Sequence, residues 1–202
     1  MAILVLLLVL SFFSGSIPFG FLVAVWTKGI DIRHFGSGNI GTTNVWRVVG
    51  KPWGILVFVL DFCKGALPVF AVGAWAGEGA SDFLYMGAAV CAVAGHSWTP
   101  FLRFKGGKGV ATSTGAVAGL TYVYPLTGII LLIALGIWLV VFLLSKYVSL
   151  ASLSAGFVFF LCSLLFPLPL AIRILALLLF LFILVRHKKN IKNLFLRKEF
   201  RF

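Results

Sequence analysis

Long runs of apolar residues alternate with short polar stretches along this chain of 202 residues. Leu, Phe and Val follow one another in these runs without the polar/apolar alternation of a half-buried strand, and an open sheet could not satisfy its edges in lipid. A helix needs roughly 20 residues to cross a hydrocarbon core of about 30 Å. The pattern therefore predicts an all-α, polytopic membrane bundle of seven helices, at residues 2–26, 53–76, 82–99, 110–122, 125–144, 149–166 and 169–185.

Composition supports this class. Hydrophobic residues make up 61% of the chain and charged residues 11%, whereas a soluble domain has about half apolar and about a quarter charged residues. The short segment at 110–122, rich in Gly, Ala and Thr, is either a full but buried span or a half-helix. The chain shows no internal repeat and no low-complexity stretch, so we expect one integral-membrane domain over residues 1–202.

The basic residues decide in favour of seven crossings. Cytoplasmic loops carry an excess of Lys and Arg, and seven crossings place every basic connection on one side, with the N-terminus outside and the C-terminus in the cytoplasm. Without the segment at 110–122, two basic connections fall on opposite sides. The outer connections carry Glu78 and Asp82 instead. The basic positions are Lys28, Arg33, Arg47 and Lys51, then Arg103, Lys105 and Lys108, then Lys146, then Arg186, Lys188, Lys189, Lys192, Arg197, Lys198 and Arg201.

Several common features are missing from the sequence. The first apolar run has no basic n-region and no cleavage site, so it does not resemble a signal peptide. The three cysteines, Cys63, Cys91 and Cys162, stand alone within apolar segments, where core packing is their ordinary role. We expect no metal and no cofactor. The functional parts are then two cytoplasmic loops, at about 27–51 and 99–109, and the tail at 186–202.

The first cytoplasmic loop has the residues of an anion-binding site. Its glycines, Gly36, Gly38 and Gly41, literally match G-x-G-x-x-G, but no buried strand precedes them, and Asp61, at the spacing of a ribose-binding acid, lies inside an apolar span. We therefore reject a dinucleotide site. Glycines, short polar side chains and flanking arginines favour a phosphate nest, the alternative being a merely flexible loop. The candidates are Ser37, Gly38, Asn39, Gly41, Thr42, Thr43, Asn44 and Arg47.

The second loop has a similar character. Two lysines bracket a glycine pair at the start of an apolar segment, but the G-x-x-x-x-G-K-[ST] pattern of a Walker A loop is absent. Alone, this loop would read as a topology signal. Because the first loop also has the residues of an anion-binding site, phosphate binding is the better interpretation of the second loop. The candidates are Lys105, Gly106, Gly107, Lys108 and Gly109, with His96 shortly before them.

Other polar residues have two possible roles each. Asp61 and Lys64, spaced i, i+3 within a span, form either a structural ion pair or part of the site. Ser149 and Ser152 start the sixth span, where hydroxyls often cap helices. His187 and Asn190 lie in a basic tail whose ordinary role is contact with lipid headgroups.

No arrangement of residues supplies an obvious nucleophile. The chain has no Ser-His-Asp set, no Cys-His pair, no HExxH and no H-x4-D spacing. The residues alone therefore indicate a membrane protein that handles phosphorylated molecules. A transporter of an organic phosphate is the rival interpretation, although both loops lie on one side and the outer connections offer no cationic site. A lipid-binding scaffold leaves the Gly/Asn pattern unexplained.

Taken together, these motifs resemble the bacterial integral-membrane acyl-phosphate:glycerol-3-phosphate acyltransferase family over nearly the whole chain. Residues 15–20, 31–33 and 36–44 are similar to its first signature, and residues 95–96, 100 and 104–112 to its second loop. Asp61, Lys64 and Gly65 match a further motif, and His187, Asn190, Ile191 and Glu199 the third signature. The sequence departs from the family at Thr42, where Ala is usual, and in the tail at Asn193 and Arg197.

The resemblance implies transfer of a fatty acyl group from acyl phosphate to the 1-hydroxyl of sn-glycerol 3-phosphate, with lysophosphatidic acid and phosphate as products. It implies the bacterial inner membrane, a site that faces the cytoplasm, and no nucleic-acid or obligate protein partner. The proton acceptor is either a histidine or the substrate's own phosphate. The implied catalytic residues are Ser37, Asn39, Thr43, Asn44, Arg47, His96 and His187; the implied binding residues are Gly38, Gly41, Thr42, Lys64, Lys105, Gly106, Gly107, Lys108, Gly109, Ser152 and Asn190.

Overall fold

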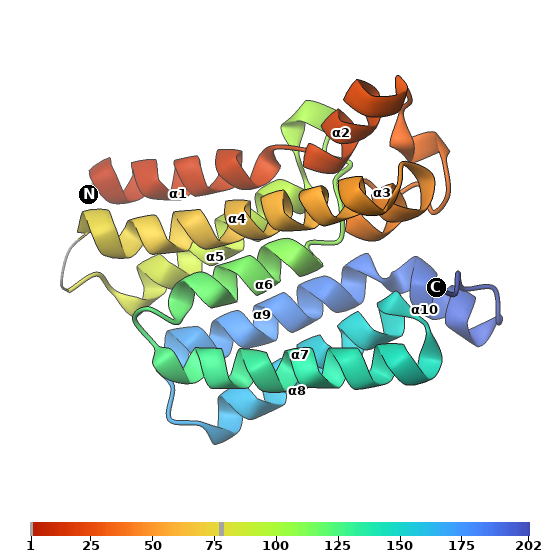
Figure 1. Ribbon diagram of the computed structural model, residues 1–202. Helices are drawn as coiled ribbons and strands as arrows, with labels where there is room; N and C mark the ends of the chain where they lie inside the picture. The colour runs from red at the N-terminus through yellow and green to blue at the C-terminus, as the bar shows by residue number, and fades with distance from the viewer. Residues whose placement is uncertain (1, 77–78) are drawn as a thin grey trace. The chain divides into compact units, whose positions relative to one another are not determined.

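The structure, a computed structural model, describes residues 2–76 and 79–202, and all regular secondary structure within them is helical (Figure 1). Glu78, one of the acids expected in an outer connection, lies outside the described residues. The chain divides into two compact units, Met1–Leu120 and Thr121–Phe202. The expectation of one integral-membrane domain over residues 1–202 stays a prediction.

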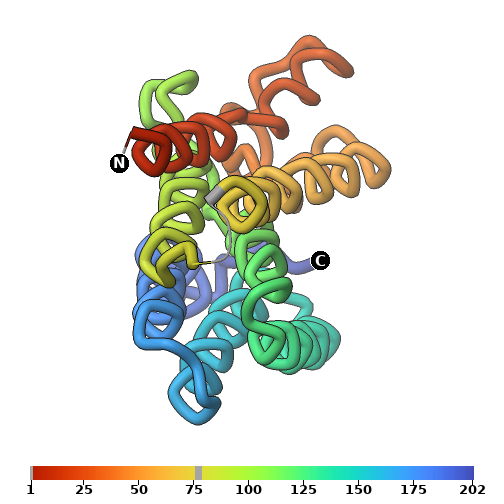
Figure 2. Tube along the Cα trace, turned by 90° about the vertical axis from the view of Figure 1, so that its left-hand side faces the viewer, coloured from red at the N-terminus to blue at the C-terminus, as the bar shows by residue number. Residues whose placement is uncertain are grey.

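Four helices of the first unit pack closely against one another. The chain runs through α1 (Ala2–Ser16), α2 (Phe19–Lys28), a 3₁₀ turn η1 (Ile32–His34), α3 (Thr42–Val48), α4 (Lys51–Ala76), α5 (Asp82–Ser97), a second turn η2 (Pro100–Leu102) and α6 (Val110–Leu120). Helix α4 packs against α6, α1 packs against α5, and α4 also touches α1 and α5. Both views of the backbone show α1 and α4 lying side by side (Figures 1 and 2).

Glycines set the spacing of these helices. A Cβ atom at Gly65 of α4 would collide with the carbonyl of Thr112, and one at Gly115 of α6 would collide with the carbonyl of Phe62. Gly15 of α1 and Gly95 of α5 meet the partner backbone in the same way. Helices in membranes associate through such close backbone contact, because lipid offers little hydrophobic drive for helix pairing.

The first apolar run is not one continuous helix. The expected span at 2–26 breaks after Ser16, because Pro18 has no N–H to donate and its ring disturbs the preceding turn. Helix α2 starts at Phe19 and ends at Lys28. The next residue, Gly29, takes the left-handed conformation with φ 64° and donates its N–H to the carbonyl of Val25. The break leaves the Ile17 carbonyl outside any helix, where it accepts a hydrogen bond from Lys64 of α4.

The second unit contains α7 (Pro125–Ser145), α8 (Val148–Leu165), α9 (Leu170–Arg186) and α10 (Lys188–Phe195), with α8 packed against both α7 and α9. Helices α9 and α10 meet at His187 with a bend of 58°. After α10 the chain turns back, and the Phe202 N–H donates to the carbonyl of Lys146 in the α7–α8 turn at 2.9 Å. The tail is therefore folded against this end of the unit.

Every predicted span is helical, the first as two helices, α1 and α2, but not all of the spans have membrane length. Within the described residues, four segments are both long and apolar enough to cross a bilayer, and the bent α9–α10 pair would make a fifth. The four are Ala2–Lys28, Lys51–Trp75, Pro125–Ser145 and Val148–Leu165. Helices α5 and α6, of 16 and 11 residues, are shorter. An all-helical protein with membrane-spanning helices is confirmed; the count of seven and the orientation stay predictions.

We expect Gly65→Ala or Gly115→Ala to destabilise the protein in detergent micelles, because the new methyl group must push α4 and α6 apart. Overpacking of this kind costs about 1–3 kcal/mol. Gly136→Ala in α7 is the matched control, because nothing lies within 4 Å of the added Cβ. Thermal unfolding of the three variants measures the effect, and equal midpoints would contradict the packing described above.

Candidate functional site

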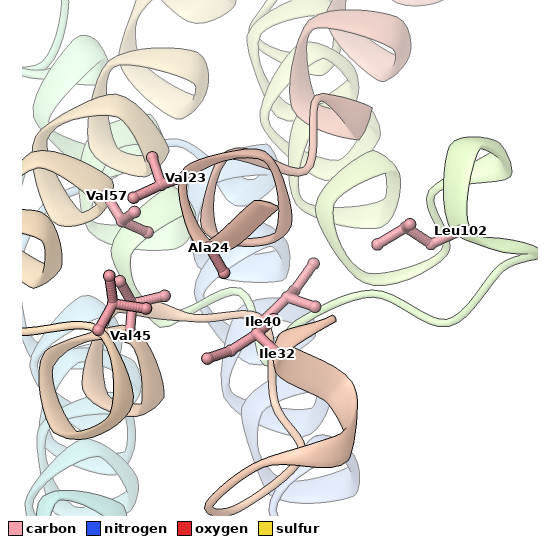
Figure 3. Packing of buried hydrophobic residues seen from close by; sticks show 8 residues of the cluster. Val23, Ala24, Ile32, Ile40, Val45, Val57 and Leu102 are labelled. Carbon is pink, nitrogen blue, oxygen red and sulfur yellow. The ribbon is translucent and has the colours of Figure 1, made fainter. Parts of the chain in front are cut away.

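Both candidate loops of the first unit rest on one cluster of buried apolar residues (Figure 3). Val23 and Ala24 come from α2, Val57 comes from α4, and Leu102 comes from the second loop. The first loop and α3 contribute Ile32, Ile40, Val45 and Val49. Each fully buried Val, Ile or Leu contributes about 1.5–3 kcal/mol relative to exposure, so this cluster fixes the two loops on a common support.

Asn44 holds the first loop together. Its side chain is 1% exposed, and its amide nitrogen donates to the carbonyls of Phe35 at 3.0 Å and Asn39 at 2.9 Å. Its amide oxygen accepts the Ser37 N–H at 2.9 Å. Gly36, with φ 58°, lies so close that a Cβ would collide with this oxygen. We therefore expect Asn44 to shape the site rather than to contact the substrate.

The backbone of this loop differs from the nest that the glycines suggested. The Gly38 N–H donates to the carbonyl of Phe35 at 3.0 Å, and the Gly41 N–H donates to the side chain of Asn39 at 2.8 Å. Together with the Ser37 N–H, these donors are occupied inside the loop instead of converging on an anion. These N–H groups therefore form no phosphate nest, and the half-buried candidate side chains of the loop are Ser37, Asn39, Thr42, Thr43 and Arg47.

A charged pair closes the start of the first loop. The Arg33 guanidinium donates to both carboxylate oxygens of Asp31, at 2.6 Å from Nη2 and 2.9 Å from Nε. These hydrogen bonds lower the pKa of Asp31 to about 2, and the carboxylate raises the pKa of Arg33. Because the aspartate pKa is depressed on folding, the pair stabilises the loop above the ordinary aspartate range and loses this effect as the pH falls towards 2.

The second loop folds back on the end of α5. The Gly106 N–H donates to the carbonyl of Ser97 at 3.0 Å, and the Gly107 N–H donates to that of His96 at 3.1 Å. A side chain on Gly107 would collide with the His96 imidazole. Lys105 is exposed and Lys108 is half-buried. The two lysines therefore flank a stretch of backbone that contacts His96.

A buried ion pair lies behind this loop. The Lys64 Nζ forms an ion pair with Oδ1 of Asp61 at 2.7 Å, and it donates to the carbonyl of Ile17 at the same distance. The imidazole Nδ1 of His96 is 3.7 Å from the same carboxylate. Lys64 is 4% exposed and Asp61 2%. This geometry supports the structural role for the pair over direct contact with a substrate, and it places His96 beneath the loop.

The remaining candidates lie in the second unit. Helix α8 is not capped by a serine: its N-cap is Tyr147, and the Ser152 hydroxyl donates to the carbonyl of Val148 at 2.8 Å while accepting from the Trp138 indole at 3.2 Å. The capping role expected for Ser149 and Ser152 is therefore wrong. The Ser149 hydroxyl instead donates to the carboxylate of Glu199 at 2.7 Å.

Glu199 also organises the tail. Its Oε1 accepts the Asn190 amide at 2.6 Å, so one carboxylate joins α8, α10 and the last residues of the chain. His187, at the bend, has its Nδ1 2.8 Å from the carbonyl of Ile183. The sequence indicated Glu199 only through its spacing from His187 in the third signature, because nothing local predicts which serine and which asparagine it would join.

The residues and the fold define a class: an all-helical membrane protein with two cationic, glycine-rich loops held on a shared apolar support. The glycerol-3-phosphate acyltransferase family model matches residues 5–197. The chain therefore belongs to the glycerol-3-phosphate acyltransferase family.

Individual relatives agree with this assignment. A glycerol-3-phosphate acyltransferase from Aquifex aeolicus is 38% identical over 97% of both chains. One from Desulforamulus reducens is 46% identical over 74% of this chain and 70% of its own length. The crystal structure of PlsY, an integral membrane glycerol 3-phosphate acyltransferase, in its glycerol 3-phosphate form has a TM-score of 0.89 at 37% identity, covering 98% of this chain and 95% of PlsY. Its lysophosphatidic acid form has a TM-score of 0.86.

We expect Lys64→Met to destabilise the protein by about 3–5 kcal/mol, because it leaves the Asp61 charge buried without its partner. The double variant Asp61→Asn, Lys64→Met removes both charges and should recover part of the stability and of the activity. Denaturant unfolding and steady-state kinetics on the single and double variants measure the coupling. If the double variant is stable but as inactive as Lys64→Met alone, Lys64 contacts the substrate and the structural role fails.

Proposed function

We propose that this protein transfers a fatty acyl group from acyl phosphate to the 1-hydroxyl of sn-glycerol 3-phosphate, releasing lysophosphatidic acid and inorganic phosphate. The reaction takes place at the cytoplasmic face of a bacterial inner membrane. The observation that carries the proposal is the pair of cationic, glycine-rich loops on one apolar cluster. Each substrate brings one phosphate, and the acyl chain of one of them partitions into lipid.

The donor is activated before it reaches the enzyme, so direct transfer is sufficient. The glycerol hydroxyl oxygen bonds to the acyl carbonyl carbon, and the bond from that carbon to the phosphate oxygen breaks. The hydroxyl proton passes to the phosphate of glycerol 3-phosphate and finally to the departing inorganic phosphate. Preorganised donors near the developing oxyanion and leaving group contribute about 3–4 kcal/mol each, and orientation of the two substrates contributes further.

Substrate assistance is supported by the position of His96. This histidine is 4% exposed, faces Asp61 through Nδ1 and is covered by Gly107. A proton acceptor must reach the attacking hydroxyl within about 2.6–3.2 Å or through one water, and a ring below the loop backbone is better placed to support the loop. We assign the second loop to the phosphate of glycerol 3-phosphate, and Ser37, Thr43 and Arg47 of the first loop to the acyl phosphate.

The reaction is tested with labelled acyl phosphate and purified protein in liposomes. Addition of glycerol 3-phosphate should give labelled lysophosphatidic acid and one equivalent of phosphate, while acyl-CoA and acyl carrier protein thioesters should give none. Without glycerol 3-phosphate, the denatured protein should carry no label, because no covalent acyl-enzyme forms. Stable label on Ser37, Ser152 or a cysteine would overturn direct transfer, and product from a thioester would overturn the donor.

The two loops should differ in their kinetics. Ser37→Ala and Arg47→Ala remove groups that act on charge growing in the transition state, so we expect a lower kcat, by about 10²–10³-fold for a lost oxyanion donor. Gly106→Ala and Gly107→Ala push the loop away from His96, so we expect a higher KM for glycerol 3-phosphate. Steady-state kinetics with each substrate varied separately decide the assignment.

The matched controls are Gly136→Ala, which should leave both constants unchanged, and Arg47→Lys, which keeps the charge but loses the forked geometry of the guanidinium. An effect of the glycine variants on the acyl phosphate KM alone would reverse the assignment of the loops. Normal kinetics in all the loop variants would show that the loops are only topology signals.

A further inference from the structure

The folded-back tail of the second unit carries a dense positive charge. Within residues 121–202, Glu199 is the only acidic residue in the sequence, and its carboxylate accepts hydrogen bonds from Ser149 and Asn190. Seven basic residues are exposed at this end of the unit. They are Lys146, Lys188, Lys189, Lys192, Arg197, Lys198 and Arg201, and we call them the tail cations.

Apolar side chains are exposed among these cations. Phe195, at the end of α10, is 86% exposed, and Leu196 and Phe200 in the following turn are also exposed. On α10, Lys188, Lys189 and Lys192 lie on one side of the helix, and Ile191, Leu194 and Phe195 lie on the adjoining side. A helix that joins a basic face to an apolar face is typical of a segment lying in the membrane interface.

The geometry of the chain holds this surface at the end of the membrane helices. Helix α10 leaves α9 at 58°, so it does not continue the path of the span. The Phe202 N–H bonds to the carbonyl of Lys146, and the Phe202 ring packs edge-on against Phe142 at 5.8 Å between centroids. Arg201 lies over the ring of Tyr147 at 5.4 Å. The tail therefore returns to the α7–α8 turn instead of extending into water.

We propose that the tail cations and the apolar residues of α10 form a binding surface for anionic phospholipid, with the headgroup phosphate on the lysines and the acyl chains against Phe195 and Leu196. A positive-inside topology signal requires charge alone, and it does not account for exposed aromatic and leucine side chains on a bent helix. An acidic soluble protein would match the charge but not this apolar face. Anionic lipid matches both.

Lipid on this surface also orders the residues on the other side of α10. Asn190, which bonds to Glu199, and His187, at the bend, belong to the same short helix-and-bend segment. A short helix moves as one body, so a lipid that holds Lys188, Lys189 and Lys192 also holds Asn190. Anionic lipid should therefore slow the opening of the tail and raise the activity of the enzyme.

The test uses the full protein in nanodiscs of phosphatidylcholine alone or of phosphatidylcholine mixed with phosphatidylglycerol. Hydrogen exchange at the amides of residues 188–202 should be slower with phosphatidylglycerol, and native mass spectrometry should show phosphatidylglycerol enriched on the protein. The triple variant Lys188→Gln, Lys189→Gln, Lys192→Gln should lose this preference by about fivefold per lysine removed. Lys→Arg substitutions at the same three positions keep the charge and should retain it.

Phe195→Ser should speed hydrogen exchange at these amides although no charge is lost. This variant separates the apolar contribution to lipid binding from the electrostatic one. Inorganic phosphate added to phosphatidylcholine nanodiscs should have no effect. Protection by phosphate alone would indicate a soluble anion site, and equal exchange in both lipid compositions would show that lipid does not bind here; either result overturns the proposal. These readouts do not depend on catalysis, so they stand apart from the test of the acyl transfer.

Discussion

A single buried ammonium group, that of Lys64, connects the parts of the first unit. A charge within a membrane-spanning helix is costly unless acceptors surround it. Asp61 supplies one acceptor, one helical turn away on α4. The other is the carbonyl of Ile17, which is available because Pro18 interrupts the helix and leaves carbonyls at its end without helical partners. The break in the first span therefore provides an acceptor for the buried lysine.

The position of the two loops follows from this contact. With Ile17 fixed to α4, helix α2 starts at a set place, and Gly20 of α2 lies directly against the carbonyl of Ile40 in the first loop. Val23 and Ala24 then complete the apolar cluster that carries both loops. On the other side, Asp61 faces His96, and the backbone of the second loop is bonded to His96 and Ser97. One charged contact therefore supports both candidate phosphate sites.

The sequence predicted the features that local pattern determines and missed those that depend on distant partners. Apolar runs gave the ends of the long helices to within a few residues, as in α7, expected at 125–144 and found at Pro125–Ser145. Glycines with short polar side chains and arginines identified the first loop as a candidate, and glycines with lysines identified the second. The sequence could not predict that the Gly38 and Gly41 N–H groups bond within the loop. These bonds depend on the positions of the Phe35 carbonyl and the Asn39 side chain. The bond from Ser149 to Glu199 could not be predicted either, because the two residues are fifty positions apart in the chain.

The proposed reaction requires no nucleophile from the protein. Acyl phosphate brings an activated carbonyl and a good leaving group, and glycerol 3-phosphate brings both the hydroxyl and an anion able to accept its proton. The protein then has to hold two anions close together and stabilise the charge that moves between them. Interactions that act only in the transition state raise the rate most, and they require donors whose positions are already fixed. In the proposed site, Asn44 bonds within the first loop and His96 lies beneath the second, so we expect these two side chains to fix the loops rather than to contact the reacting atoms.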